Sequence, residues 1–126
     1  MKLEILQPTF TVCKVPDISA IDFTDAFYFI AKTDEELSVV CASTAIPENA
    51  SQIDNDWKAF RIQGVLDFSL IGILAKITNI LAEHKISVFA VSTYNTDYIL
   101  IKSENFLKAI DVLKNNGYEI AGEAQS

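Results

Sequence analysis

The chain is poor in the residues that hold metals and cofactors. Its 126 residues include one histidine and two cysteines, and His84, Cys13 and Cys41 are too few to form a zinc or iron site. The two cysteines lie far apart, without CxxC spacing, in apolar strand-like runs. We therefore expect buried free thiols in a reducing compartment, with no metal and no cofactor.

Positive charge is also scarce. Ten lysine and arginine residues stand against seventeen acidic ones, for a net charge of −7. Nucleic acid and anionic membranes need concentrated positive charge, so neither is an expected partner. No run approaches the roughly 20 apolar residues of a membrane span, and Met1–Ile5 does not begin a signal peptide. We expect a cytoplasmic protein.

Recognised catalytic patterns are missing. The sequence has no glycine-rich phosphate loop, GxSxG elbow, HExxH or DxDxDG motif. Cys41 and His84 could in principle pair as nucleophile and base, but Cys41 lies in an apolar run typical of a core strand. The scattered acids between residues 17 and 36 fit a solvated surface better than a carboxylate dyad. The sequence thus predicts that the protein is not an enzyme.

The second half of the chain has a regular order of elements. Residues 57–64 alternate as a half-buried strand, and apolar residues from Leu70 to Leu81 recur at helical spacing. Residues 86–94 and 98–101 predict a hairpin, followed by a helix from Ser103, a stop at Gly117 and a short strand. This order is the βαββαβ pattern of ferredoxin-like folds.

The first half is less regular. Strand-like segments occupy residues 3–6, 10–15, 27–31 and 37–42, and the polar stretch 47–56 is typical of a linker. Two helices cover only one face of the second-half sheet, so the first half is the candidate to pack on the other face. We expect an α+β fold of two tandem ferredoxin-like units with antiparallel sheets, an abbreviated one at 1–56 and a complete one at 57–126.

Two segments carry more polar chemistry than their turns require. Residues 67–72 lead into a helix, whose free amides and dipole attract a small carboxylate. Gly72 would allow a ligand to approach closely, although its spacing equally fits a glycine that only permits helix–sheet packing. Residues 92–98 gather hydroxyls, an amide and a carboxylate at the hairpin tip, where turn formation alone is the competing interpretation.

At these segments the sequence resembles the ACT-domain superfamily. The resemblance rests on residues 67–75, 81–89 and 92–100. Within the superfamily, the chain is most similar to small bacterial two-ACT proteins related to the regulatory domain of aspartate kinase. The CASTOR-type arginine sensor is also similar, and Glu36–Cys41 resembles the first-unit motif of the bacterial group. The resemblance implies a unit that binds a small effector, usually an amino acid, where two ACT units meet, for allosteric control rather than catalysis.

The resemblance also implies an assembly and a set of ligand contacts. The arginine sensor has four ACT units, so this chain would form a homodimer with its C-terminal units facing each other. Asp97 would bind the ammonium or guanidinium group, the Ser69–Ile73 amides the carboxylate, and Tyr94 the methylenes. The strand beginning after His84 would form the other wall. The full set of implied ligand residues is Asp67, Ser69, Leu70, Gly72, Ile73, Ile86, Ser87, Val88, Thr93, Tyr94, Thr96 and Asp97.

Two positions depart from the resemblance. Thr96 stands where the arginine sensor has aromatic residues, and Lys32-Thr33 stands where the bacterial group often has arginine before threonine. The leading interpretation is an amino-acid-binding regulatory protein that acts on an unidentified protein. The alternative is a protein–protein interaction module with a vestigial pocket, and a small enzyme of unrecognised type is the weakest hypothesis.

Overall fold

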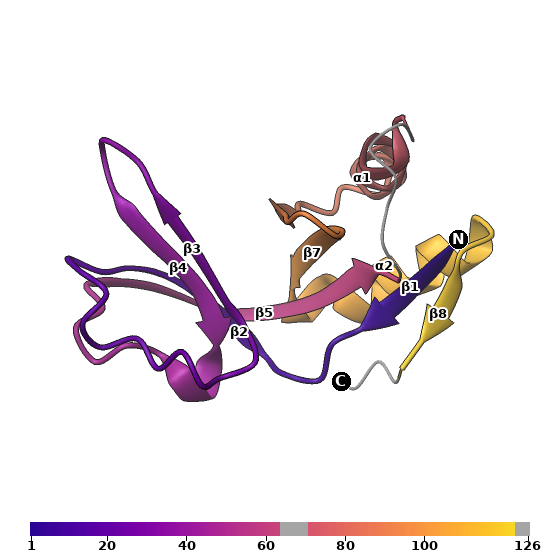
Figure 1. Cartoon of the computed structure of the whole chain (residues 1–126). Coiled ribbons are helices and arrows are strands. Elements are labelled where there is room, and N and C mark those ends of the chain that lie inside the picture. The colour runs from indigo at the N-terminus through magenta and orange to yellow at the C-terminus, as the bar shows by residue number, and fades with distance from the viewer. Residues whose placement is uncertain (64–70, 123–126) are drawn as a thin grey trace. The chain divides into compact units, whose positions relative to one another are not determined.

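The chain forms two compact units. Figure 1 shows its computed structural model, which describes residues 1–63 and 71–122. The C-terminal unit comprises Met1–Gln7 and Lys58–Ser126, and the N-terminal unit comprises Pro8–Trp57. Met1–Gln7 therefore group with the second half of the chain, although they precede the N-terminal unit in the sequence.

The C-terminal unit has the expected order of strands and helices. Its elements are the second half of β5 (Gln52–Ile62), α1 (Ile73–Glu83), β6 (Phe89–Ser92), β7 (Asp97–Lys102), α2 (Ser103–Asn115) and β8 (Glu119–Ala121). This βαββαβ sequence is consistent with a ferredoxin-like fold.

One further strand joins this sheet from the start of the chain. Strand β1 (Lys2–Ile5) pairs antiparallel with β5, where Leu3 lies opposite Ile62, and parallel with β8, where Leu3 lies opposite Ile120. The strand order is β8-β1-β5-β7-β6. Leu3 and Ile5 are buried in the core, and this burial explains why the first residues belong here.

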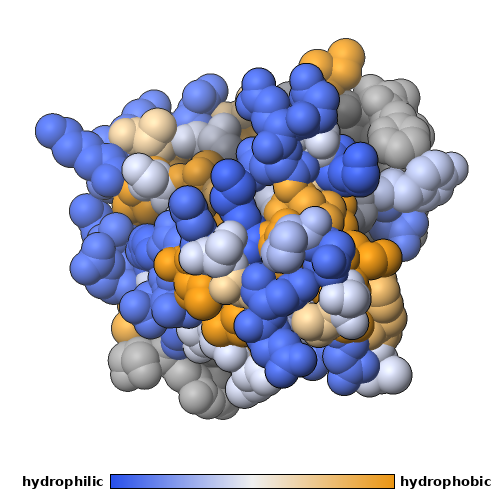
Figure 2. Space-filling view, turned by 90° about the vertical axis from the view of Figure 1, so that its left-hand side faces the viewer, coloured by the Kyte–Doolittle hydropathy of each residue, from blue (hydrophilic) through white to orange (hydrophobic). Residues whose placement is uncertain are grey.

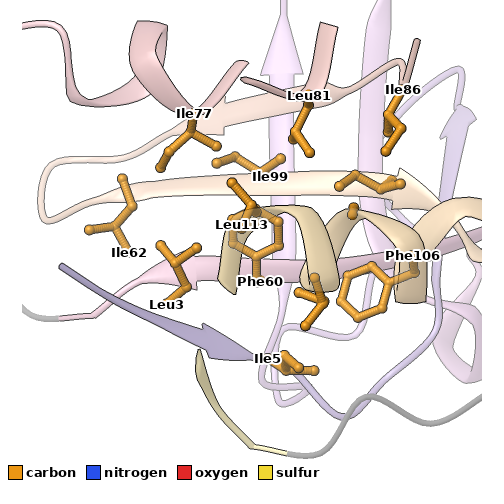
Figure 3. Close-up of a cluster of buried hydrophobic side chains, with 13 residues drawn as sticks. Leu3, Ile5, Phe60, Ile62, Ile77, Leu81, Ile86, Ile99, Phe106 and Leu113 are labelled. Carbon is orange, nitrogen blue, oxygen red and sulfur yellow. The ribbon is translucent and has the colours of Figure 1, made fainter. Parts of the chain in front are cut away.

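Both helices pack on the same face of this sheet. Alternate residues of β1, β5 and β7 point into one cluster, in which Phe60 and Phe106 have ring centroids 6.5 Å apart. In Figure 3, Ile62 and Ile77 lie at one end of the cluster, and Ile86 lies at the other. Helix α1 therefore begins near the end of β5 and runs back toward the other end of the strands.

Each helix ends in a Schellman motif. After α1, Ile86 N–H donates to the Leu81 carbonyl (3.0 Å) and Lys85 N–H to the Ala82 carbonyl (2.9 Å). After α2, Tyr118 N–H donates to the Leu113 carbonyl at 3.1 Å. Both motifs need a left-handed residue, which is Lys85 (φ 60°) in the first and Gly117 (φ 92°) in the second.

This pair of caps gives a matched prediction. Lys85→Gly should raise the free energy of unfolding by about 0.5–1 kcal/mol, because glycine removes the left-handed strain at a smaller entropic cost. Gly117→Ala should lower it by ~1 kcal/mol through backbone strain alone, since an added Cβ would meet nothing within 4 Å. Urea unfolding of the two variants measures both changes, and a less stable Lys85→Gly protein would contradict the assignment.

The N-terminal unit is an antiparallel sheet of strand order β3-β4-β2-β5. Its elements are β2 (Phe10–Lys14), β3 (Tyr28–Lys32), β4 (Leu37–Ala42), a 3-10 turn at Ser43–Ala45 and the first half of β5. Residues 8–57 are all described and contain no α-helix. Cys13 and Cys41 lie buried with Val39 in the core of this unit. In Figure 2, hydrophilic side chains surround smaller hydrophobic groups on the face that is shown.

The expected linker at 47–56 is wrong for residues 52–56, which form the start of β5. Their side chains are exposed and polar, so no hydrophobic alternation reveals the strand; backbone pairing with β2 holds it, with Ile53 opposite Cys13. The register shifts between Phe10 and Val12, and Asp56 has φ 70°. A bulge therefore interrupts β5 just before it enters the C-terminal unit.

Candidate functional site

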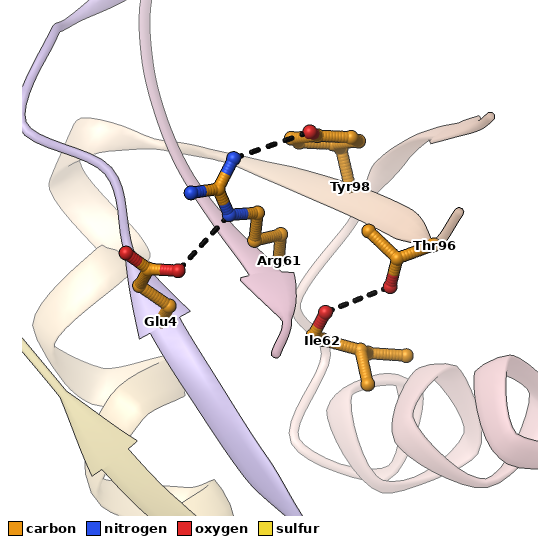
Figure 4. Close-up of polar contacts among 5 residues, drawn as sticks. All are labelled: Glu4, Arg61, Ile62, Thr96 and Tyr98. Atoms are coloured by element: carbon orange, nitrogen blue, oxygen red, sulfur yellow. Dashed lines mark hydrogen bonds and ion pairs between the residues drawn. The ribbon is translucent and has the colours of Figure 1, made fainter. Parts of the chain in front are cut away.

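The hairpin between β6 and β7 is fixed to the end of β5. The Thr96 side chain is 7% exposed, and its hydroxyl donates to the Ile62 carbonyl at 2.7 Å (Figure 4). The hairpin tip, the end of β5 and the start of α1 thus lie at the same end of the strands. We call this end of the sheet the hairpin edge. A group bound here would meet residues from three elements.

Part of the polar chemistry at the hairpin tip serves the turn itself. Thr93 donates to the Thr96 carbonyl through its N–H at 2.9 Å and through its hydroxyl at 3.1 Å. The Thr96 hydroxyl is also hydrogen-bonded within the chain, to the Ile62 carbonyl. Fewer hydroxyls at the tip can therefore bind a ligand than the sequence suggests. Tyr94, in contrast, is 80% exposed.

Asp97 is the half-buried carboxylate of the hairpin. It is the first residue of β7, opposite Ser92 of β6, and its Oδ1 accepts a hydrogen bond of 2.5 Å from the Ser92 hydroxyl. Within residues 1–63 and 71–122 the carboxylate has no ion pair with a lysine or arginine. An ammonium or guanidinium group of a ligand would supply the missing positive charge.

Gly72 caps the start of α1 in a left-handed conformation, with φ 77°. A Cβ built there would meet no atom of the described residues within 4 Å, so close packing against the described part of the sheet is not what requires a glycine at this position. The neighbouring predicted residues Asp67, Ser69 and Leu70 lie outside the described part of the chain.

Ile73 follows Gly72 and lines a hollow of about 250 Å³ that sequence analysis missed. The hollow forms where α1 begins, α2 ends and the chain enters β1, and burial raises the pKa of its Tyr118 side chain. Spacing could not reveal it, because its residues come from three distant segments. The lining residues are Met1, Ile73, Lys76, Asn116, Gly117 and Tyr118.

The remaining predicted residues lie at the other end of β6. Ile86 is 4% exposed, and its N–H is already bound in the helix cap. Ser87 is exposed and Val88 packs partly against the core. Since β6 spans Phe89–Ser92, these three residues precede it and the hairpin follows it. Within one chain the structure therefore separates the predicted ligand set into two groups at opposite ends of one strand.

A polar cluster on β1, β5 and β7 was not expected from the sequence. Arg61 donates through Nε to Glu4 Oε1 at 3.0 Å and through Nη1 to the Tyr98 hydroxyl at 3.3 Å (Figure 4). Hydrogen bonding to Glu4, then to Tyr98, raises the pKa of the Arg61 guanidinium. The cluster depends on the Glu4–Arg61 register, which local sequence patterns do not encode, and it links three strands beside the hairpin.

The cysteine–histidine pair that the sequence disfavours also lacks the chemistry of a nucleophile in the structure. Burial raises the pKa of the Cys41 thiol to about 12, so the reactive thiolate is almost absent near neutral pH. The His84 ring lies against the Ile80 carbonyl, with its Nδ1 at 3.0 Å. The described residues contain no group of three or more potential metal ligands. Among the helices of the described chain, none is long and apolar enough to cross a membrane.

Comparison with known families and structures gives a consistent result. The family model of the ACT domain matches residues 52–115, half of the chain. A separate model of an N-terminal domain matches residues 9–49, so a second ACT copy in that region stays a prediction. No curated protein sequence matches the chain.

Solved structures also resemble the chain. A protein from Agobacterium tumefaciens is 32% identical, with a TM-score of 0.83 over 98% of this chain and 94% of that one. The regulatory subunit of aspartate kinase from Thermus thermophilus, in its ligand-free form, is 12% identical with a TM-score of 0.65, over 91% of this chain and 96% of that subunit. Aspartate kinase from Clostridium acetobutylicum, an allosteric enzyme, is 14% identical with a TM-score of 0.61, over 86% of this chain and 33% of the enzyme. The two aspartate kinase likenesses concern the fold.

Proposed function

The chain belongs to the ACT domain family, and from this premise we propose that it is a regulatory protein that binds an amino acid between the C-terminal units of a homodimer. ACT domains are regulatory rather than catalytic, which suggests a ligand-binding regulatory role. The amino acid and the dimer are the finer parts of the proposal. Binding would alter the action of a second protein, as yet unidentified.

The observation that carries the proposal is the position of the predicted residues at the two ends of β6. Strand β6 pairs with β7 alone in the described sheet, so its other side is an edge. Its sequence, Phe-Ala-Val-Ser, contains no charge or proline to discourage pairing. If two copies pair antiparallel through β6 about a two-fold axis, Ser87 and Val88 of one chain come beside Thr93 and Tyr94 of the other. Two equivalent sites then form, each incomplete without the second chain.

Each polar group of a zwitterionic ligand would have a partner in such a site. Asp97 supplies a half-buried carboxylate for an ammonium or guanidinium group. The first turn of α1 after Gly72 supplies amides and the positive end of a helix dipole for a carboxylate. Tyr94 supplies an exposed ring for the methylenes. An α-amino acid has these three features together.

Asp97→Asn tests the ligand assignment without disturbing the hairpin, because asparagine keeps an oxygen to accept from Ser92. A thermal-shift screen of the wild type against the twenty amino acids first identifies the ligand. Isothermal titration should then show that Asp97→Asn binds it about 10- to 100-fold more weakly, the loss of one charge-assisted hydrogen bond of ~1.5–3 kcal/mol.

Asp111→Asn is the matched control, since Asp111 is exposed on α2, and it should bind as tightly as the wild type. Equal affinity of Asp97→Asn and wild type would remove Asp97 from the site.

A second candidate function is an interaction module without a ligand. The internal hydrogen bonds of Thr93 and Thr96 favour it, because a hairpin that satisfies its own hydroxyls needs no effector. Failure of all twenty amino acids to stabilise the folded protein would favour this function over the first.

A further inference from the structure

The loop at residues 16–27 of the N-terminal unit presents two large apolar side chains to solvent. Ile18 is 50% exposed and Phe23 is 65% exposed. Ile21 lies between them in the sequence and is only 9% exposed, packed in the core of the unit. The loop is thus anchored at its centre, while an apolar side chain on either side of the anchor remains at least half exposed.

Each exposed side chain stands in the same local pattern, between an aspartate and a hydroxyl residue. Ser19 N–H donates to Asp17 Oδ1, and Thr24 N–H donates to Asp22 Oδ1, both at 3.0 Å. The hydroxyls of Ser19 and Thr24 donate to the same oxygens at 2.5 Å. These hydrogen bonds, the hydroxyl bond first, lower the pKa of both aspartates, so both remain ionised at neutral pH.

Further contacts hold the loop in one conformation. Ile21 N–H donates to the Ile18 carbonyl and Asp25 N–H to the Asp22 carbonyl, both at 3.2 Å. Asn49 Nδ2 donates to Asp17 Oδ1 at 3.2 Å. The Phe23 ring lies against Tyr28, with centroids 6.4 Å apart. A partner would therefore meet a preorganised surface and would lose little binding energy to ordering it.

The charge of the loop selects the partner. The segment from residue 15 to residue 31 has three aspartates and no lysine or arginine. Nucleic acid and anionic membranes would be repelled. A second copy of this chain carries the same aspartates and a net charge of −7, so it would bring like charges together. A cationic surface with apolar side chains would complement both the carboxylates and the exposed Ile18 and Phe23.

We propose that residues 16–27 form a docking loop for a cationic, apolar segment of another protein, in which lysine or arginine residues alternate with large apolar ones. Phe23 is the central apolar contact, and Asp17 and Asp22 bind the positive charges beside it. The inference is independent of amino-acid binding, because all of its residues belong to the N-terminal unit.

A model peptide tests the inference on the whole chain. A blocked peptide of alternating arginine and leucine, labelled for fluorescence anisotropy, should bind the wild type. Phe23→Ser should weaken binding roughly tenfold or more, as expected for an aromatic anchor. Asp17→Asn combined with Asp22→Asn should also weaken it, and asparagine preserves an acceptor for Ser19 and Thr24. Peptides with serine in place of leucine, or glutamate in place of arginine, should bind poorly.

Matched variants separate docking from general attraction to an acidic protein. Leu107→Ser removes an exposed apolar side chain of the other unit, and Asp34→Asn with Glu35→Gln removes two exposed charges outside the loop. Neither should change peptide affinity. Equal binding by all variants would overturn the proposal, as would absence of peptide binding, or self-association of the wild type that Phe23→Ser abolishes. Amino-acid affinity of Phe23→Ser, measured in parallel, should equal that of the wild type.

Discussion

Ala90→Glu is expected to convert the proposed homodimer into monomers and to abolish amino-acid binding with it. Ala90 is exposed near the middle of the edge strand β6, so a glutamate there leaves the fold intact. In a two-fold antiparallel pairing of β6 with its copy, the two new carboxylates lie close to the axis. Like charges held together at an interface cost several kcal/mol, and a cost of ~3 kcal/mol weakens dimerisation roughly 100-fold. Sedimentation equilibrium measures this change.

Charge reversal supplies the decisive control. Ala90→Lys alone should also be monomeric, whereas an equimolar mixture of Ala90→Glu and Ala90→Lys should form a heterodimer and regain the ligand. Asn115→Glu, on an exposed position of α2, should dimerise and bind as the wild type does. A dimer that survives Ala90→Glu would place the interface elsewhere, and a wild type that is monomeric with ligand bound would contradict a shared site.

The elements of the C-terminal unit could be predicted because their patterns are local. The apolar stripe of α1 follows from spacing over a few residues, and α2 begins at Ser103 as expected, although its N-cap is Lys102 and no side chain caps it. The pairing of β1 between β5 and β8 could not be predicted, because Leu3 and Ile62 meet only through a register that spans the N-terminal unit. The polar start of β5 was missed since backbone pairing, rather than side-chain burial, holds it in place.

In the candidate site, too, local features could be predicted from the sequence and contacts between distant residues could not. Sequence chemistry identified the polar hairpin and the open position at Gly72, both of which the structure places at the hairpin edge. It could not show that the hydroxyl of Thr96 donates to the Ile62 carbonyl, since that bond joins residues 34 positions apart. It also could not show that Ile86 is part of the core, because an apolar residue after a helix fits a pocket wall and a Schellman cap equally well.

Alkaline pH is expected to destabilise the folded protein through its buried thiols. Burial, followed by the nearby Cys13, raises the pKa of Cys41 from the usual 9.0 to about 12, so the folded state keeps a proton that the unfolded chain releases. The contribution of the Cys41 thiol to the free energy of unfolding is complete below pH 9. It falls by about 1.4 kcal/mol per pH unit up to pH 12. The free energy of unfolding should therefore drop by roughly 2–3 kcal/mol between pH 8 and pH 11 from this group. Burial also raises the pKa of Cys13 and of Tyr28, which act in the same direction.

Substitution of Cys41 isolates the contribution of this thiol. Cys41→Val fills nearly the same volume without a titratable group, so its loss of stability between pH 8 and pH 11 should be smaller than that of the wild type by roughly 2–3 kcal/mol. Tyr28→Phe should reduce the loss separately, because the hydroxyl of Tyr28 is bound to the Ala45 carbonyl in the folded state. Urea unfolding at several pH values measures these slopes. Parallel curves for Cys41→Val and wild type between pH 9 and pH 11 would mean that the thiol is solvated, and that the core of the N-terminal unit is open to water.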